Sequence, residues 1–171
     1  MNESFVEYLN TICPNQETIL VATRAFISEL TDDLLPSEMK ERMISSVDNR
    51  EELERGILKL EMSAQERLDA CMEFLAWAWE DETNRKSIQA AFEGTATKLP
   101  AIEAGLVALV AMYGMYLIAT GGLSKKTHTI RQKEDGTFEE TISFEYEPST
   151  GPLSIVSKLF GRNFNKGEDD D

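Results

Sequence analysis

Apolar residues recur at intervals of three or four positions through the first 97 residues of the chain. This period predicts amphipathic helices, because residues three and four apart share one helix face. Six helices are predicted, with these apolar stripes: Phe5, Leu9 and Ile12; Leu20, Ile27, Leu30 and Leu34; Met39, Met43 and Val47; Leu53, Ile57 and Leu60; Leu68, Met72, Leu75 and Trp79; Ile88 to Phe92. We therefore expect residues 1–97 to form a helical bundle.

Particular residue types predict where these helices begin and end. Pro14 suits the first turn of the second helix, and Pro36 ends that helix because the residue before a proline disfavours the α conformation. Ser37 is the expected cap of the third helix, and the polar run from Glu80 to Lys86 predicts a break before the sixth. Two pairs have the spacing of a capping box and open the fourth and fifth helices, namely Asp48 with Glu51 and Ser63 with Glu66.

The segment from Ala104 to Leu123 carries no charge, in a chain of which 28% of the residues are charged. A helix of this length spans about 30 Å and is apolar all round, so it is either the buried centre of the protein or a membrane span. Burial in protein is favoured because Tyr113 and Tyr116 fall in mid-segment, whereas membrane tyrosines gather at the interface. Small residues allow close helix packing in either case, namely Gly105, Ala108, Ala111 and Gly114.

After this segment the apolar period changes from 3.6 to 2, which predicts a β-hairpin with strands at Thr127–Lys133 and Thr137–Glu147. A two-residue loop, Asp135-Gly136, would put Ile130 on the face opposite Phe138. A three-residue loop with Gly136 left-handed pairs Ile130 with Glu140 instead, and we predict this loop. The register then gathers one apolar face, composed of Ile130, Phe138, Ile142, Phe144 and Tyr146.

The last residues predict a short basic helix and an acidic tail. Leu153 to Phe160 is mainly apolar, and Lys158, Arg162 and Lys166 are spaced by four. The predicted fold class is therefore mainly α. It comprises a helical bundle (1–97), a central apolar or membrane helix (98–124), a β-hairpin (125–147), a short basic helix (148–167) and a tail (168–171).

Charge and cysteine content narrow the class of protein. Residues 1–97 hold 9 Lys/Arg and 20 Asp/Glu, a net charge of −11, and the whole chain has a net charge of −14. Such a surface repels phosphate, so nucleic acid is not an expected partner. Cys13 and Cys71 form no metal or redox motif, and the first residues lack the apolar run of a signal peptide, so a reduced, cytoplasmic protein is expected.

Catalytic groups are scarce. His128 is the only histidine, no phosphate-binding glycine loop is present, and no ligand set for zinc or calcium occurs, so we expect no cofactor and no metal. The paired carboxylates Asp32-Asp33 and Asp81-Glu82 could serve an enzyme only if they converged, and adjacent residues on a helix point apart. An enzyme using these carboxylates stays as a lesser alternative.

The remaining chemistry favours binding to another protein. We expect a non-enzymatic adaptor or accessory component, with partner-binding candidates at Trp77, Trp79, Phe138, Phe144 and Tyr146. The alternative is a single-span membrane protein that forms homo-oligomers through Gly105, Ala108, Ala111 and Gly114, with residues 125–171 cytoplasmic. Its candidate membrane-surface cations are Lys125, Lys126, Lys158, Arg162 and Lys166.

One stretch has a family resemblance in its layout. An apolar Gly/Ala-rich helix (AGLVALVAMYGMYLIATGG) is followed by Lys125-Lys126 and by a hairpin built on Asp-Gly (THTIRQKEDGTFEETISFE). This order, within residues 98–147, resembles the small effector-associated components of bacterial conflict systems. The resemblance implies a non-catalytic partner of an effector enzyme.

Overall fold

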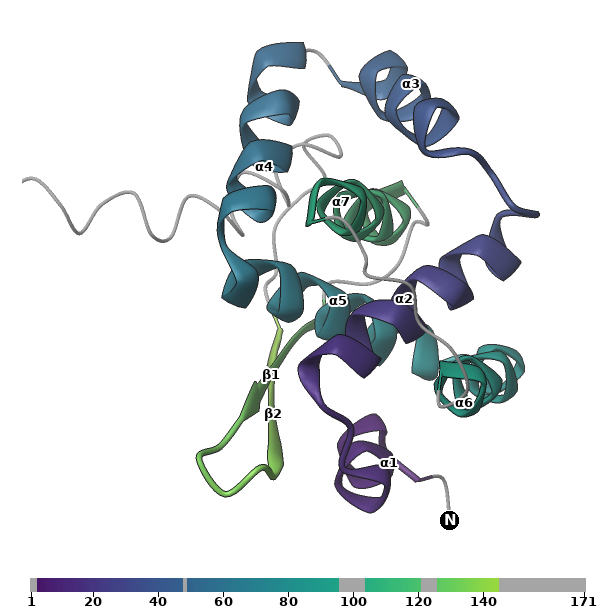
Figure 1. Ribbon diagram of the computed structural model, residues 1–171, viewed down its shortest axis with the longest axis vertical. Coiled ribbons are helices and arrows are strands. Elements are labelled where there is room, and N and C mark those ends of the chain that lie inside the picture. Colours follow the sequence, from purple (N-terminus) through teal and green to yellow (C-terminus); the bar gives the residue numbers. More distant parts are fainter. Residues whose placement is uncertain (1–2, 48, 96–103, 121–125, 145–171) are drawn as a thin grey trace, which may run out of the picture.

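The computed structural model describes residues 3–47, 49–95, 104–120 and 126–144, and this part of the chain is mainly α-helical (Figure 1). The elements within it are the helices α1 (Phe5–Ile12), α2 (Gln16–Leu30), α3 (Pro36–Ser46), α4 (Arg50–Met62), α5 (Ala64–Trp79), α6 (Glu82–Thr95) and α7 (Ala104–Thr120), and the strands β1 (Lys126–Gln132) and β2 (Phe138–Phe144). The predicted helical class and hairpin are confirmed. The predicted helix at 153–160 lies outside the described residues.

Side-chain caps start the first two helices. α1 begins with a capping box in which the Ser4 hydroxyl accepts a hydrogen bond from the Glu7 amide (3.2 Å) and the Glu7 carboxylate accepts one from the Ser4 amide (2.7 Å). These bonds lower the pKa of Glu7. α2 is capped by Asn15, whose side chain accepts from the Thr18 amide at 2.8 Å. Pro14 therefore precedes the cap, and its predicted place in the first turn is wrong.

α2 ends four residues earlier than the sequence predicts. Asp32 and Asp33 adopt left-handed backbone angles (φ 52° and 57°), and the Asp33 amide donates to the Ser28 carbonyl at 2.7 Å. These bonds close the helix at Leu30, before Pro36 can act. Two consecutive left-handed residues that are not glycine are costly, although aspartate tolerates the conformation better than most because its side chain bonds locally. The Asp33 carboxylate does so by accepting from the Ser28 hydroxyl.

α3 begins at Pro36, so Ser37 is not its cap. The backbone amide of Leu35 is satisfied instead by the Glu38 carboxylate at 2.9 Å. Proline at the first helical position needs no amide partner, which makes it suitable for this place.

α4 begins one residue later than a cap at Asp48 would place it. Its cap is Asn49, whose side-chain oxygen accepts from the amides of Glu51 (3.1 Å) and Glu52 (3.3 Å). Asp48 itself lies outside the described residues. Adjacent Asp and Asn have similar capping preferences, so spacing alone did not distinguish them.

Only two residues, Glu80 and Asp81, separate α5 from α6 in the sequence. The Ser63 hydroxyl accepts from the Glu66 amide at 3.3 Å, which confirms Ser63 as the cap of α5. The reciprocal bond of the predicted capping box is not formed, because the Ser63 amide donates to the Lys59 carbonyl at 3.0 Å. α6 starts at Glu82 rather than at Ile88, because the Asp81 carboxylate accepts from the Thr83 amide at 2.8 Å and restarts the helix. The predicted break up to Lys86 is therefore wrong.

The core is built on the inner face of α5. All the side chains predicted to point inward from this helix are buried, namely Leu68, Cys71, Met72, Leu75 and Trp79. Trp79 also fixes α1, because Tyr8 stacks on its ring at 4.8 Å and its indole nitrogen donates to the Glu3 carbonyl at 2.9 Å. Aromatic pairs of this kind contribute about 0.5–1.5 kcal/mol beyond the area that they bury.

α7 is the helix seen end on in Figure 1, with α2, α3, α4 and α5 around it. Its side chains from Val107 to Met115 are mostly buried, including Tyr113. The described helix begins at Ala104, as predicted, and runs to Thr120, and the last three residues of the predicted segment, 121–123, lie outside the described residues. None of the helices in the described ranges combines the length and the apolar character that crossing a lipid bilayer requires.

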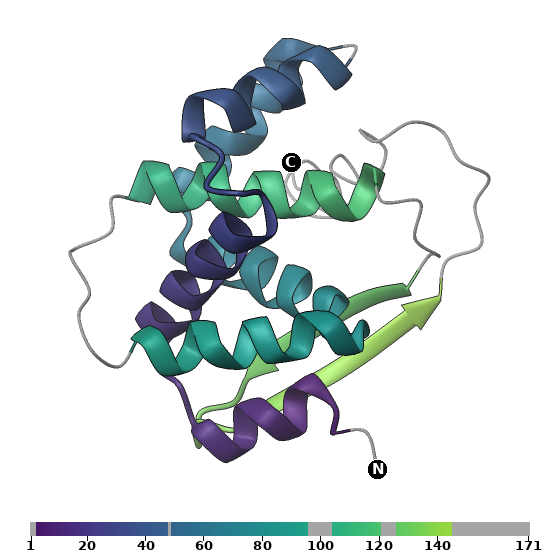
Figure 2. The same cartoon turned by 90° about the vertical axis from the view of Figure 1, so that its right-hand side faces the viewer.

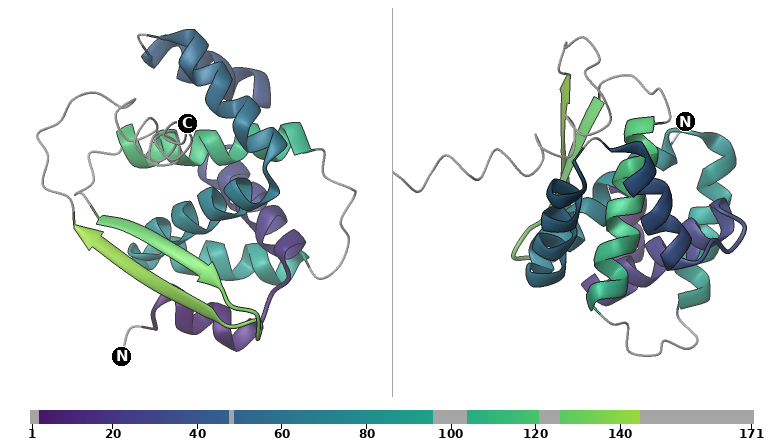
Figure 3. Two further views of the ribbon diagram at one scale, coloured as in Figure 1. Left: turned by 90° about the vertical axis from the view of Figure 1, so that its left-hand side faces the viewer. Right: turned by 90° about the horizontal axis from the view of Figure 1, so that it is seen from above.

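The hairpin has the predicted register. Ile130 pairs with Glu140, Gln132 pairs with Phe138, and Gly136 has a φ of 85°, so the three-residue loop is confirmed. Ile130 and Phe138 are both buried, and the hairpin lies across α5 and α1 (Figure 3). These two residues of the predicted apolar face therefore pack against the same chain, whereas the side chains of Ile142 and Phe144, and Tyr146 as a whole, lie outside the described residues.

Asn10 joins the first helix to the last strand. Its side-chain amide donates to the Phe138 carbonyl at 3.2 Å, and its side-chain oxygen accepts from the Phe138 amide at 2.7 Å. This pair of bonds copies the pattern that a third strand would make at the outer edge of β2. One side chain therefore satisfies the strand edge at this position.

The two cysteines differ in environment, and we expect them to differ in reactivity. Cys13 is exposed at the end of α1, whereas burial raises the pKa of Cys71 to about 12. Because the thiolate is the reactive form, a disulfide reagent at pH 8 should titrate one thiol in the native protein and the second only after unfolding. The Cys13→Ser variant should show no fast thiol. Rapid modification of Cys71 in the folded variant would contradict the burial.

Candidate protein-binding surface

A pocket of about 400 Å³ lies between α3 and α7. α3 crosses over α7 at the edge of the molecule, as Figure 2 shows from the side. The pocket is lined by five residues of α3 and one of α7: Glu38, Glu41, Arg42, Ser45, Ser46 and Tyr116. We call these six residues, together with the outer face of α7 defined below, the α3–α7 surface.

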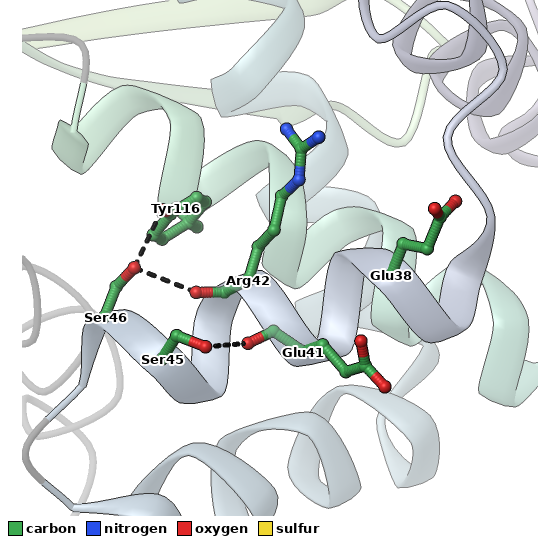
Figure 4. A pocket seen from close by; sticks show the side chains of 6 residues that line it. All are labelled: Glu38, Glu41, Arg42, Ser45, Ser46 and Tyr116. Atoms are coloured by element: carbon green, nitrogen blue, oxygen red, sulfur yellow. Dashed lines mark hydrogen bonds between the residues drawn. The ribbon is translucent and has the colours of Figure 1, made fainter.

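Hydroxyl groups connect the two helices at one end of this pocket (Figure 4). The oxygens of Ser46 and Tyr116 lie 3.0 Å apart, and the Ser46 hydroxyl is also 2.8 Å from the Arg42 carbonyl. A hydroxyl has one hydrogen to donate. When Ser46 gives that hydrogen to the Arg42 carbonyl, the bond between the helices runs from the Tyr116 hydroxyl to Ser46.

The outer face of α7 borders the pocket. At 100° per residue, Leu106, Leu109, Tyr113, Tyr116 and Leu117 fall within about 100° of the helix circumference. Tyr113 is buried, whereas the other four are only partly buried. An uncharged helix therefore keeps a row of apolar side chains partly in contact with water, beside a pocket.

The pocket is lined by hydroxyl groups and charged side chains. The Ser45 hydroxyl donates to the Glu41 carbonyl at 2.8 Å, so both pocket serines are bonded to their own helix. None of the lining residues is a histidine or a cysteine that could activate them. Across the described ranges, no group of three or more His, Cys, Asp or Glu side chains is placed to hold a metal ion.

The aromatic residues predicted to bind a partner lie elsewhere. Trp79 and Phe138 are buried in the core, which leaves little of either for a partner. Trp77 is partly buried, stacks on Phe74 at 5.9 Å and has no hydrogen-bond partner for its indole nitrogen among the described residues. The side chain of Phe144, and Tyr146 as a whole, lie outside what the structure describes. Of the five candidates, Trp77, Trp79 and Phe138 are therefore placed away from the α3–α7 surface.

The small residues of α7 pack within the chain. Ala108 and Ala111 are fully buried, and a Cβ atom on Gly114 would lie 2.9 Å from Cγ of Phe74 on α5. Gly105 faces the Glu61 carboxylate of α4 at 3.3 Å from the same ideal Cβ position. The close approach that these residues permit is therefore used by α4 and α5.

The predicted charged sites are dispersed. Asp32-Asp33 forms the turn after α2, and Asp81-Glu82 opens α6, so the two acidic pairs serve local backbone structure. Lys126 is the first residue of β1, and its side chain is not described. The other candidate membrane-surface cations lie outside the described residues, namely Lys125, Lys158, Arg162 and Lys166.

A perturbed carboxyl group lies on α5, away from the pocket. Burial, with a smaller contribution from the negative charge of Asp69, raises the pKa of Glu73 to about 7. The pKa of Asp69 is also raised by burial, although a hydrogen bond from Gln65 and the charge of Arg131 oppose the shift. Glu73 is therefore a group whose charge changes near neutral pH.

Sequence analysis did not identify the α3–α7 surface. Ser46 and Tyr116 are 70 positions apart, and their contact depends on how α3 crosses α7. One signal was present in the sequence, because a tyrosine inside an uncharged helix needs a polar partner for its hydroxyl. Comparison with protein-family models, curated proteins and solved structures found no match to this chain.

Proposed function

We propose that the chain is a non-enzymatic protein-binding component, an adaptor or accessory subunit, and that it binds through the α3–α7 surface. The observation that supports this most directly is the partly exposed apolar row on α7, formed by Leu106, Leu109, Tyr116 and Leu117. Apolar patches bordered by polar residues are typical of protein interaction sites. Here the border is provided by the charged side chains of α3.

The net charge of the chain indicates the sign of the charge that we expect on the partner. Glu38, Glu41 and Arg42 are exposed at the pocket, so two carboxylates face one guanidinium there, and the chain as a whole has a net charge of −14. An acidic surface speeds the encounter with a basic one and disfavours acidic competitors. We therefore expect a partner with a basic rim around an apolar contact.

The test uses the full chain as bait and compares two charge-introducing variants. Leu109→Glu places a carboxylate on the outer face of α7, and Leu58→Glu places one on an exposed site of α4 as the matched control. A stoichiometric partner should bind the wild type and Leu58→Glu alike, and its affinity for Leu109→Glu should fall at least tenfold. Equal affinity for both variants would contradict the proposal, as would a turnover reaction lost on changing Asp81 or Glu82.

A further inference from the structure

α3 is held by few contacts. α3 and α4 bury the fewest side chains of the seven helices in the described part, two each, and the two of α3 are Met39 and Met43. They are one turn apart and form a single narrow contact. Methionine is flexible and fits surfaces of irregular shape, so such a contact is adaptable rather than specific.

The polar contacts of α3 with its neighbours are also weak. A hydrogen bond between the exposed Ser46 hydroxyl and the Tyr116 hydroxyl connects it to α7. An ion pair connects it to α4, but the Lys40 nitrogen is 4.0 Å from the Glu54 carboxylate, and both side chains are more than 40% exposed. Exposed ion pairs contribute little to stability. The pocket between α3 and α7 shows in addition that the two helices are incompletely packed.

The connection that precedes α3 is suited to act as a hinge. None of the five residues from Thr31 to Leu35 is buried, and Leu35 is 60% exposed. Within this connection, Asp32 and Asp33 adopt consecutive left-handed backbone conformations. A movement of α3 would allow both residues to leave these costly conformations. Displacing α3 therefore breaks few interactions of the connection that precedes it.

Removal of α3 would expose the part of α7 that it packs against. Tyr113 is 2% exposed, and the partly buried Leu106, Leu109, Tyr116 and Leu117 share its face of α7. α3 itself shows what can pack on α7. It is an amphipathic helix that contacts α7, buries two apolar side chains four residues apart and keeps its other positions polar or partly exposed.

We propose that α3 is a displaceable cover, and that an amphipathic helix of a partner protein, with two apolar anchors one turn apart, replaces it on α7. This inference rests on the proposed function and specifies the partner's binding element: the contact is the apolar row on α7, and the charged side chains of α3, which border that row in the closed protein, are displaced together with α3. It corresponds to recognition of a helix in a groove, with α3 holding the place of the partner. The partner then binds only the molecules in which α3 is displaced. Its apparent dissociation constant is the intrinsic one divided by the fraction of such molecules.

Hydrogen exchange of the full wild-type chain tests the displacement without any partner. Backbone amides in the centre of α3, around Met39 and Met43, should exchange at least 100-fold faster than those between Leu68 and Leu75 in α5. Exchange of the two helices at one common rate would overturn the inference. It would leave the proposed function standing, because a partner could still bind on top of a closed α3.

Peptide binding tests the occupant. The probe is a labelled peptide of residues 34–47, and its control carries Met39→Glu and Met43→Glu. The same two substitutions in the full chain prevent its own α3 from docking, so the probe should bind this variant at least tenfold more tightly than the wild type. The control peptide should bind neither protein.

Three results would contradict the peptide prediction. These are equal affinity of the probe for both proteins, binding of the control peptide, and a wild-type dimer that forms by exchanging α3 between two copies. The last would identify a second copy as the occupant. Should the double variant be unfolded by circular dichroism, the exchange rates of the wild type decide the matter alone.

Discussion

Replacing Gly114 with alanine is expected to lower the free energy of unfolding by up to about 2 kcal/mol, although alanine is the better helix former. The new Cβ atom would lie 2.9 Å from Cγ and 3.1 Å from Cδ2 of Phe74, and that ring is fully buried. Overpacking of a core costs about 1–3 kcal/mol, and the gain in helix propensity of about 1 kcal/mol offsets only part of it. Thermal or urea unfolding measures the difference.

The same substitution at Gly94 provides the control. Nothing lies within 4 Å of a Cβ atom at Gly94 in α6, so Gly94→Ala should be neutral or stabilise the protein by up to about 1 kcal/mol. In the Gly114→Ala background, Phe74→Leu should cost less than it does in the wild type, because it removes the ring that clashes. Additive effects of the two substitutions would contradict the predicted contact.

The second large effect concerns pH. Glu73 has a pKa of about 7 in the folded protein, against 4.5 for an ordinary glutamate, because its charged form is poorly solvated. An acid with a raised pKa binds more protons in the folded state than in the unfolded state. Its contribution is therefore fully favourable below about pH 4.5 and is lost as the pH rises to about 7. We expect this group to cost the protein about 2–3 kcal/mol at pH 8.

The Glu73→Gln variant isolates this contribution. It should be more stable than the wild type at pH 8 by about 1–3 kcal/mol, and the advantage should disappear at pH 4.5. Denaturant unfolding at several pH values makes the comparison, with Glu134→Gln in the exposed hairpin loop as the control. A constant difference between Glu73→Gln and the wild type at all pH values would show that lost contacts, not ionisation, cause it.

Local patterns predicted the elements that depend on local interactions. The hairpin register followed from the alternation around Asp135-Gly136, because only one loop length puts Ile130 and Phe138 on the same face. The cap at Ser63 followed from its spacing to Glu66. These signals succeed because a turn and a cap are decided by residues a few positions apart.

Boundaries failed where two local signals competed. Pro36 is the predicted end of α2, but Asp32 and Asp33 end it first through their backbone conformation. Asn49, and not the predicted Asp48, caps α4. Spacing did not distinguish the two residues, because Asp and Asn are similarly good caps. Neither outcome changes the fold, because the apolar faces of the helices stay the same.

The candidate site was beyond the reach of these patterns. The spacing of small residues indicated close packing of the helix but did not identify its neighbours; these residues are Gly105, Ala108, Ala111 and Gly114. The neighbour is α5 at Gly114 and α4 at Gly105. The pocket at Tyr116 depends on the crossing of two helices distant in sequence. Crossing geometry is set by the whole set of side chains at the contact, and a stripe on one helix does not specify it.

The bonds between Asn10 and Phe138 have a consequence for synthesis of the protein. They join positions 128 residues apart, so the N-terminal helix acquires this support only when the chain has been made as far as the hairpin. After Phe92 has been made, the ribosome needs several more seconds to reach Phe138 at about 5–20 residues per second. During that interval, the face of α5 that β1 later covers stays open. A nascent chain whose synthesis stalls in this interval would expose this face of α5 to chaperones.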